Sequence, residues 1–130
     1  MKLTKNFNSD EFGSNLSVTA IQNYYILCLF ALQFVRDRFG EVHITNGYRT
    51  TMDQERLIKE GYEPSPTSQH LFGEAADFVC PHVKDMRMVY DFLVNELQWP
   101  GEVILYPKLG HVHCAIPHIG VTADHFIKEG

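Results

Sequence analysis

Two histidines in the last quarter of the chain, His111 and His113, are separated by a single residue. The stretch around them reads as a β-strand, in which alternate side chains point to one face, so the two residues lie about 7 Å apart along the backbone. That spacing lets both imidazoles converge on a shared ligand or substrate. A second segment with chemistry-bearing side chains, His70 and Asp77, lies further upstream.

Asp77 stands in the middle of a strand-like stretch, residues 75–79. A carboxylate in such a position is costly to bury unless a cation meets it. Gly73 and the neighbouring alanines remove side-chain bulk, so the backbone and a metal site can come close together. Two neutral imidazoles, one carboxylate and one open position make a catalytic zinc site, and imidazole ligands favour zinc over magnesium. The alternative is a hydrogen-bonded polar cluster without a metal.

The elements that must position these residues begin with a long helix. Ser17 is a candidate N-cap, apolar residues follow at helical spacing, and Gly40 ends the pattern, which together predict a helix over about residues 18–39. Its polar positions are few, so we expect it to be covered on more than one side. Residues 1–16 contain turn formers and two phenylalanines, and we expect them to lie against the core as an ordered arm.

The rest of the chain alternates between short strands and helices. The pattern predicts strands at residues 42–45, 75–79, 102–106 and 111–116, a helix from Thr50 or Thr51 to about 60, a loop at 62–68 and a helix at 84–98. The last two strands are joined by four residues, which suits a hairpin. This order favours an α+β fold, with an antiparallel sheet flanked by helices, and the length of 130 residues suits a single domain over 1–130.

Composition excludes several classes of function. The net charge of −5 and a pI near 5.7 argue against nucleic acid as the main partner, because phosphate binding needs clustered Lys and Arg. The most apolar run, residues 24–32, is shorter than the roughly 20 residues of a membrane span. No signal-peptide pattern is present at the N-terminus, so we expect cytoplasmic synthesis. The three cysteines are expected to be buried thiols rather than a disulfide framework.

A family pattern runs through these residues. Ser-x-His-x-x-Gly-x-Ala-x-Asp over residues 68–77, followed by His-x-His at 111–113, resembles the zinc D-alanyl-D-alanine carboxypeptidase family. That group includes D-alanyl-D-alanine dipeptidases and the L-alanyl-D-glutamate endopeptidases of phage endolysins, and it shares its fold with the amino-terminal domain of hedgehog proteins. The resemblance extends over roughly residues 45–115.

The resemblance implies roles for individual residues. His70, Asp77 and His113 would bind zinc (Zn2+). Arg49, from Gly-Tyr-Arg at 47–49, would polarise the scissile carbonyl or hold a substrate carboxylate, because its planar guanidinium suits either task. His111 would be the general base or would stabilise the oxyanion.

Ser68 and Gln69 would hydrogen-bond substrate or groups that support the metal ligands. The chain departs from the family pattern at Gly110, three residues before the last zinc histidine, where several members place Glu or Asp as general base. The base must then be His111, or a carboxylate from elsewhere such as Glu102 if its strand neighbours the site.

Other polar residues have simpler interpretations. Arg49 has an alternative as a turn residue paired with Asp53 or Glu55. Glu74 and Glu102 are expected to be surface or supporting groups. Four histidines outside the pattern are not expected to be ligands: His43, His82, His118 and His125.

The sequence therefore predicts a zinc metallopeptidase acting on peptidoglycan stem peptides, of D,D-carboxypeptidase or L,D/D,D-endopeptidase type. The small size and the lack of an export signal resemble phage or prophage lytic enzymes. The alternatives are a non-catalytic zinc-containing binding module of the same fold, as the hedgehog relative shows, and a zinc amidohydrolase acting on other peptides. The oligomeric state is left open.

Overall fold

The structure is a computed structural model that describes residues 1–49, 51–61, 69–118 and 123–129. For residues 51–54, 71 and 72 it describes the backbone alone. The predicted loop over residues 62–68, which contains Ser68, lies outside the described residues.

The N-terminal arm is a small hairpin. Strands β1 (Lys2–Thr4) and β2 (Phe7–Asn8) pair antiparallel and lead into a short 3₁₀ turn, η1 (Ser9–Glu11). Side chains from both sides of the hairpin bend hold it against the long helix: Thr4 donates to Gln33 Oε1, and Gln33 donates to Asn6 Oδ1. The two phenylalanines of the arm are buried, as expected.

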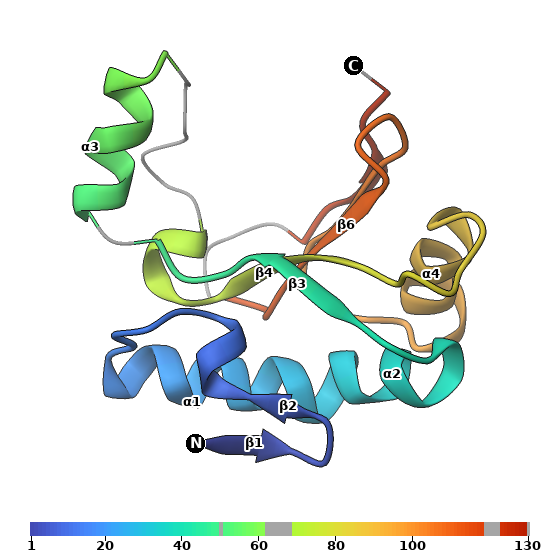
Figure 1. The fold of residues 1–130 in the computed structure, drawn as a ribbon. Helices are drawn as coiled ribbons and strands as arrows, with labels where there is room; N and C mark the ends of the chain where they lie inside the picture. The colour runs from blue at the N-terminus through green and yellow to red at the C-terminus, as the bar shows by residue number, and fades with distance from the viewer. Residues whose placement is uncertain (50, 62–68, 119–122, 130) are drawn as a thin grey trace.

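The long helix is continuous from residue 18 to 39 and has three parts: α1 (Val18–Leu27), a π-helical turn η2 (Cys28–Leu32) and α2 (Gln33–Phe39). Ser17 caps it as predicted, since its hydroxyl accepts a hydrogen bond from the Ala20 N–H at 3.1 Å. Gly40 follows the helix with φ of 86°, a conformation that favours glycine. The sheet and the N-terminal hairpin cover two sides of the helix (Figure 1), but a third side carries exposed apolar residues.

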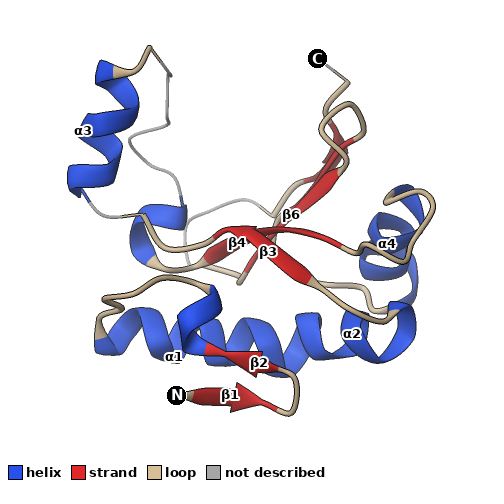
Figure 2. Ribbon diagram, viewed as in Figure 1, coloured by secondary structure: helices blue, strands red, loops and turns tan. Residues whose placement is uncertain are grey.

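The main sheet has five strands in the order β3-β4-β6-β5-β7. Their bounds are β3 (His43–Asn46), β4 (Ala75–Val79), β5 (Val103–Tyr106), β6 (His111–Ala115) and β7 (His125–Ile127). The pairs β3–β4, β4–β6 and β6–β5 are antiparallel, and β5 and β6 form the predicted hairpin. The expectation of a wholly antiparallel sheet is wrong at one edge, because β7 pairs parallel with β5 and makes the sheet mixed. Figure 2 shows these strands in red above the long helix.

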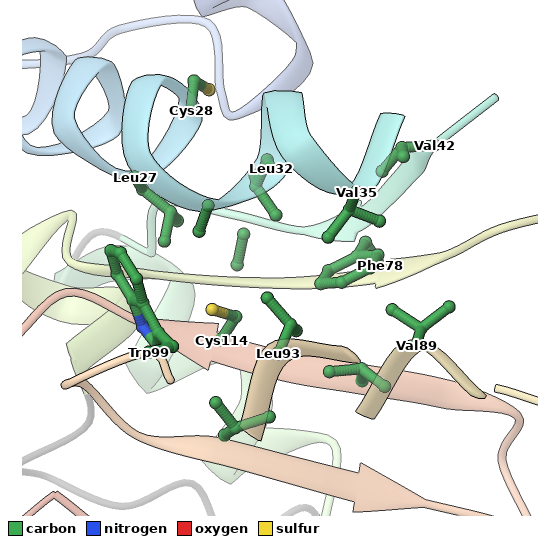
Figure 3. Close-up of a cluster of buried hydrophobic side chains, with 14 of the residues drawn as sticks. Leu27, Cys28, Leu32, Val35, Val42, Phe78, Val89, Leu93, Trp99 and Cys114 are labelled. Carbon is green, nitrogen blue, oxygen red and sulfur yellow. The ribbon is translucent and has the colours of Figure 1, made fainter. Parts of the chain in front are cut away.

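Two further helices complete the α+β fold. The first, α3 (Thr51–Lys59), matches the prediction, whereas the predicted helix at 84–98 is shorter, with α4 (Arg87–Asp91) continuing into a π-helical turn, η4 (Phe92–Glu96). One face of the sheet, through Phe78 and Cys114, packs with the long helix and with Val89 and Leu93 of the second helix in a single core (Figure 3). The three cysteines are buried and unpaired, as expected. The other face of the sheet carries the polar side chains that follow.

Candidate metal centre

Strand register places Asp77 beside His113. The two residues are direct partners across the antiparallel pair β4–β6, and the next partners along the same face are Ala75 and Ala115. Because side chains alternate along a strand, Asp77 and His113 share the face opposite the hydrophobic core, where Phe78, Val112 and Cys114 point. The small alanines leave room above the sheet for a third side chain to approach.

That third side chain is His70. It lies in a one-turn 3₁₀ helix, η3 (Gln69–Phe72), which directly precedes β4. Asp77 Oδ1 is 2.9 Å from His113 Nδ1 and 3.4 Å from His70 Nε2, and one donor atom from each of the three residues lies within 4.8 Å of the others. Both histidines are buried, and their ring centroids are 5.2 Å apart.

Backbone contacts fix the orientation of His70. Its Nδ1 lies 2.8 Å from the carbonyl oxygen of Gly47. A carbonyl only accepts, so Nδ1 donates a proton to it, and Nε2 is the nitrogen that faces Asp77. This hydrogen bond from the second ring nitrogen is typical of metal-binding histidines. The carbonyl of His70 in turn accepts the backbone N–H of Arg49 at 2.9 Å.

Gly73 sets the distance between the turn and the long helix. Its φ is +65°, and a Cβ at this position would lie 2.6 Å from the Cβ of Ala20 and 2.8 Å from its Cα. Helix α1 therefore packs directly against the bend that joins His70 to β4. Glycine is required here both by backbone conformation and by the lack of space.

The electrostatics of the three residues favour a bound cation. Burial raises the pKa of Asp77, but hydrogen bonding and charge from His113 and His70 outweigh it, so the net pKa lies well below the usual range. Burial lowers the pKa of His113, whereas the carboxylates of Asp77 and Glu102 raise it, to about 9. The two carboxylates beside His113 thus favour positive charge at this point, which a divalent cation would also satisfy.

Glu102 neighbours the site, which meets the condition set from the sequence. It directly precedes β5, and its Oε1 lies 2.9 Å from His113 Nε2. The contact is an ion pair by distance and does not meet the geometry of a hydrogen bond, so among the described residues this nitrogen is the buried side-chain polar atom without a hydrogen-bond partner.

His111 lies one pleat further along β6 on the same face as His113. Its ring packs on that of Tyr106, the residue opposite it on β5, with centroids 4.8 Å apart. Burial lowers the pKa of His111, and the nearby His113 and His70 lower it further, against the opposing charge of Asp77. The imidazole is therefore held mostly neutral at pH 7, which is the form that accepts a proton.

The predicted substrate-binding residues have different surroundings. Arg49 is half-buried and is tied through its backbone to His70. Gln69 donates from its side-chain amide to the carbonyl of Ile116 at 3.2 Å, so it links the η3 turn to the end of β6. Ser68 lies outside the described residues.

The remaining polar residues lie outside the cluster. Glu74 is buried rather than on the surface, and its Oε2 lies 2.5 Å from His118 Nδ1. His82 lies beside Glu41, and His125 Nε2 contacts the carbonyl of Gly101. His43 is exposed on β3. None of these four histidines is part of the three-residue cluster found within the described part of the chain.

Asn46, the first residue of an Asn-Gly pair, is part of the site but was not among the residues predicted from the sequence. Asn46 ends β3, pairs with Asp77 in the register and donates from Nδ2 to Asp77 Oδ2 at 3.4 Å. The contact leaves Oδ1 directed toward the two histidines and helps to fix which carboxylate oxygen serves as ligand. An Asn-Gly pair signals a turn so strongly that its second role has no signature in a single sequence.

A family model described as peptidase M15 matches residues 5–115, which is most of the chain and includes every residue of the cluster. The chain belongs to the peptidase M15 family. Its helices and mixed sheet agree with the fold of this family. No curated protein matches the chain.

Peptidase M15 enzymes are typically zinc-dependent, and the residues present fit that ion. Two imidazoles and one carboxylate are a zinc donor set that leaves a position open for water or substrate. The oriented nitrogen of His70, the low pKa of Asp77 and the two carboxylates around His113 all favour a bound cation. The family and the cluster together indicate a zinc metallopeptidase.

Proposed function

We propose that this M15 protein hydrolyses amide bonds in peptidoglycan stem peptides, as a D,D-carboxypeptidase or an L,D/D,D-endopeptidase. The observation that carries the proposal is that His70 Nε2 and His113 Nδ1 both lie close to Asp77 Oδ1, in a chain that matches the peptidase M15 family. The substrate class comes from the likeness of the Ser-x-His-x-x-Gly-x-Ala-x-Asp segment to enzymes that act on cell-wall peptides.

Zinc would be held by His70 Nε2, Asp77 Oδ1 and His113 Nδ1, and it would supply a Lewis acid and a water with a pKa near 7. The chain's own residues orient these ligands. Gly47 fixes the tautomer of His70, while Asn46 holds the second oxygen of Asp77. These supporting hydrogen bonds stabilise one geometry of the donor atoms before a metal arrives.

Proton transfer is assigned to His111. Its lowered pKa keeps the ring ready to accept a proton at neutral pH, and it shares the sheet face of the ligands. Several members of the family place an acidic base at the position of Gly110, which has no side chain. Gly110 lies in the turn before β6 with φ of +74°, a conformation that favours glycine. Glu102 is assigned to His113, whose Nε2 it contacts, and Arg49 to the substrate carbonyl or carboxylate.

Replacing His111 by Ala is expected to lower kcat by about 10²- to 10⁴-fold while the protein still binds one zinc ion, because only the proton-transfer group is lost. Glu102→Gln is expected to weaken zinc binding by about 10- to 100-fold, because it acts through a ligand. Steady-state kinetics and competition with a chromophoric zinc chelator separate the two effects. His43→Ala, at an exposed site on β3, is the matched control. If kcat is unchanged in His111→Ala and falls strongly in Glu102→Gln, the general base is Glu102 rather than His111.

The substrate class is tested with a panel of peptides. Purified peptidoglycan fragments and ordinary L-peptides of the same length are incubated with the zinc-loaded protein, and products are identified by mass spectrometry. We expect cleavage of the fragments that contain D-residues and cleavage at least 100-fold slower for the L-peptides. Faster cleavage of the L-peptides would replace the cell-wall assignment with a general zinc amidohydrolase.

A non-catalytic zinc module is the second candidate. Gly110, at the position of an acidic base, is the feature that favours it. Stoichiometric zinc binding without turnover of any peptide in the panel would select it over the enzyme.

A further inference from the structure

The long helix exposes a continuous apolar stripe on the side away from the core. The stripe comprises Tyr25 (46% exposed), Ile26 (39%), Leu29 (39%), Phe30 (54%) and Phe34 (49%). Ile26, Phe30 and Phe34 follow one another at four-residue intervals, and so do Tyr25 and Leu29, so the five residues form two neighbouring rows on one side of the helix. The opposite side of the same helix is fully buried through Tyr24, Leu27 and Ala31, among others. The exposed stripe is therefore additional to what the core requires.

The exposed area of the stripe is comparable with the apolar part of a standard protein interface. At roughly 200 Å² for a fully accessible large side chain, the five exposed fractions amount to about 450 Å². A standard protein interface buries about 800 Å² on each partner, and about 56–65% of that area is apolar, or about 450–520 Å². The stripe alone supplies the apolar part of one such interface.

The rim of the stripe argues against a membrane or a nucleic acid as occupant. The helix residues that border it include Gln22, Gln33, Asp37 and Arg38, and Arg38 pairs with Glu96. A helix that lies on an anionic membrane carries several Lys or Arg on its polar border. The helix is long and apolar enough to cross a membrane, but its inner side forms the core of this fold.

Spacing within the stripe suits a second copy of the same chain. Ile26 and Phe34 stand four residues before and four residues after Phe30. A two-fold axis through Phe30 would pair two such helices antiparallel and place Ile26 of each against Phe34 of the other. Such a contact is isologous and closes at two subunits, so it leaves no unpaired apolar face.

We propose that this face of the helix, centred on Phe30, is the interface of a homodimer. The metal cluster lies on the face of the sheet that points away from the helix, so the metal cluster of each subunit stays open in the dimer. The proposal is independent of the enzymatic assignment, because none of the stripe residues contributes to the cluster.

Sedimentation velocity of the full chain from 1 to 100 µM tests the proposal. We expect a species of twice 15.0 kDa, and a shift to the monomer in Phe30→Glu, with the dissociation constant of the dimer raised at least 100-fold. Met88→Glu is the matched control, since Met88 is a similarly exposed apolar residue (55%) on α4, outside the stripe, and it should leave the dimer intact.

Circular dichroism and zinc content report whether each variant is folded, and Phe34→Asp replaces Phe30→Glu if the latter does not fold. A wild-type chain that is monomeric at 100 µM overturns the proposal. A dimer that persists in both stripe variants overturns it as well. A monomer that binds vesicles of phosphatidylglycerol and phosphatidylethanolamine through the stripe would assign the face to a membrane instead.

Discussion

The variant Asp77→Asn is expected to lose both its zinc and at least about 10³-fold of its peptide hydrolysis. Asp77 Oδ1 lies between His70 and His113, so this single oxygen is common to both halves of the cluster. Asparagine keeps the size of the side chain but removes the negative charge that holds the cation. Elemental analysis of the purified variant and its rate on cell-wall peptides are the two measurements.

Asp37→Asn makes the same chemical change at an exposed position on α2, where the carboxylate accepts a hydrogen bond from Gln33. It should keep one zinc per chain and the full rate. An Asp77→Asn protein that retains stoichiometric zinc and activity would show that the cluster is a polar network rather than the metal site.

The variant Gly73→Ala is expected to destabilise the fold by at least about 3 kcal/mol, or to prevent folding. The positive φ costs an alanine about 1–2 kcal/mol. The added methyl would also lie 2.6 Å from Ala20 Cβ and 2.8 Å from its Cα, so α1 or the η3 turn must move. At roughly 3–5 °C per kcal/mol for a chain of this size, Tm should fall by at least about 10 °C.

Gly110→Ala separates the two causes. Its φ is +74°, close to that of Gly73, but a Cβ there would meet nothing within 4 Å. We expect a loss of about 1–2 kcal/mol from the backbone conformation alone. Equal melting temperatures for the two variants would mean that close packing of the turn on α1 contributes little to stability.

The parts of the fold that were predictable have strong local patterns. The long helix has a serine cap, helical spacing and a terminal glycine, and its bounds agree with the structure. The N-terminal hairpin has strands of three and two residues, too short for an alternating pattern to stand out. The last strand, β7, pairs parallel with a strand some 20 residues earlier, and such non-local pairing leaves no trace in a single sequence.

The candidate site likewise has some residues that the sequence predicted and some contacts that only the strand register creates. His70, Asp77 and His113 were predictable because their types and spacing match a family pattern, and the structure brings them together. The contact between Glu102 and His113 depends on how β5 and β6 align, which the sequence could express only as a condition. The contact of Asn46 with Asp77 depends equally on the register of β3 with β4.

The most direct test of the zinc site is a titration of the metal-free protein with zinc. The protein is stripped with a chelator, zinc is added in fractions of an equivalent, and bound metal and the rate of peptide hydrolysis are followed together. We predict that both rise linearly and reach a plateau at one equivalent, and that Asp77→Asn shows neither rise. Hydrolysis that proceeds at the full rate before any zinc is added would contradict a metal centre at His70, Asp77 and His113.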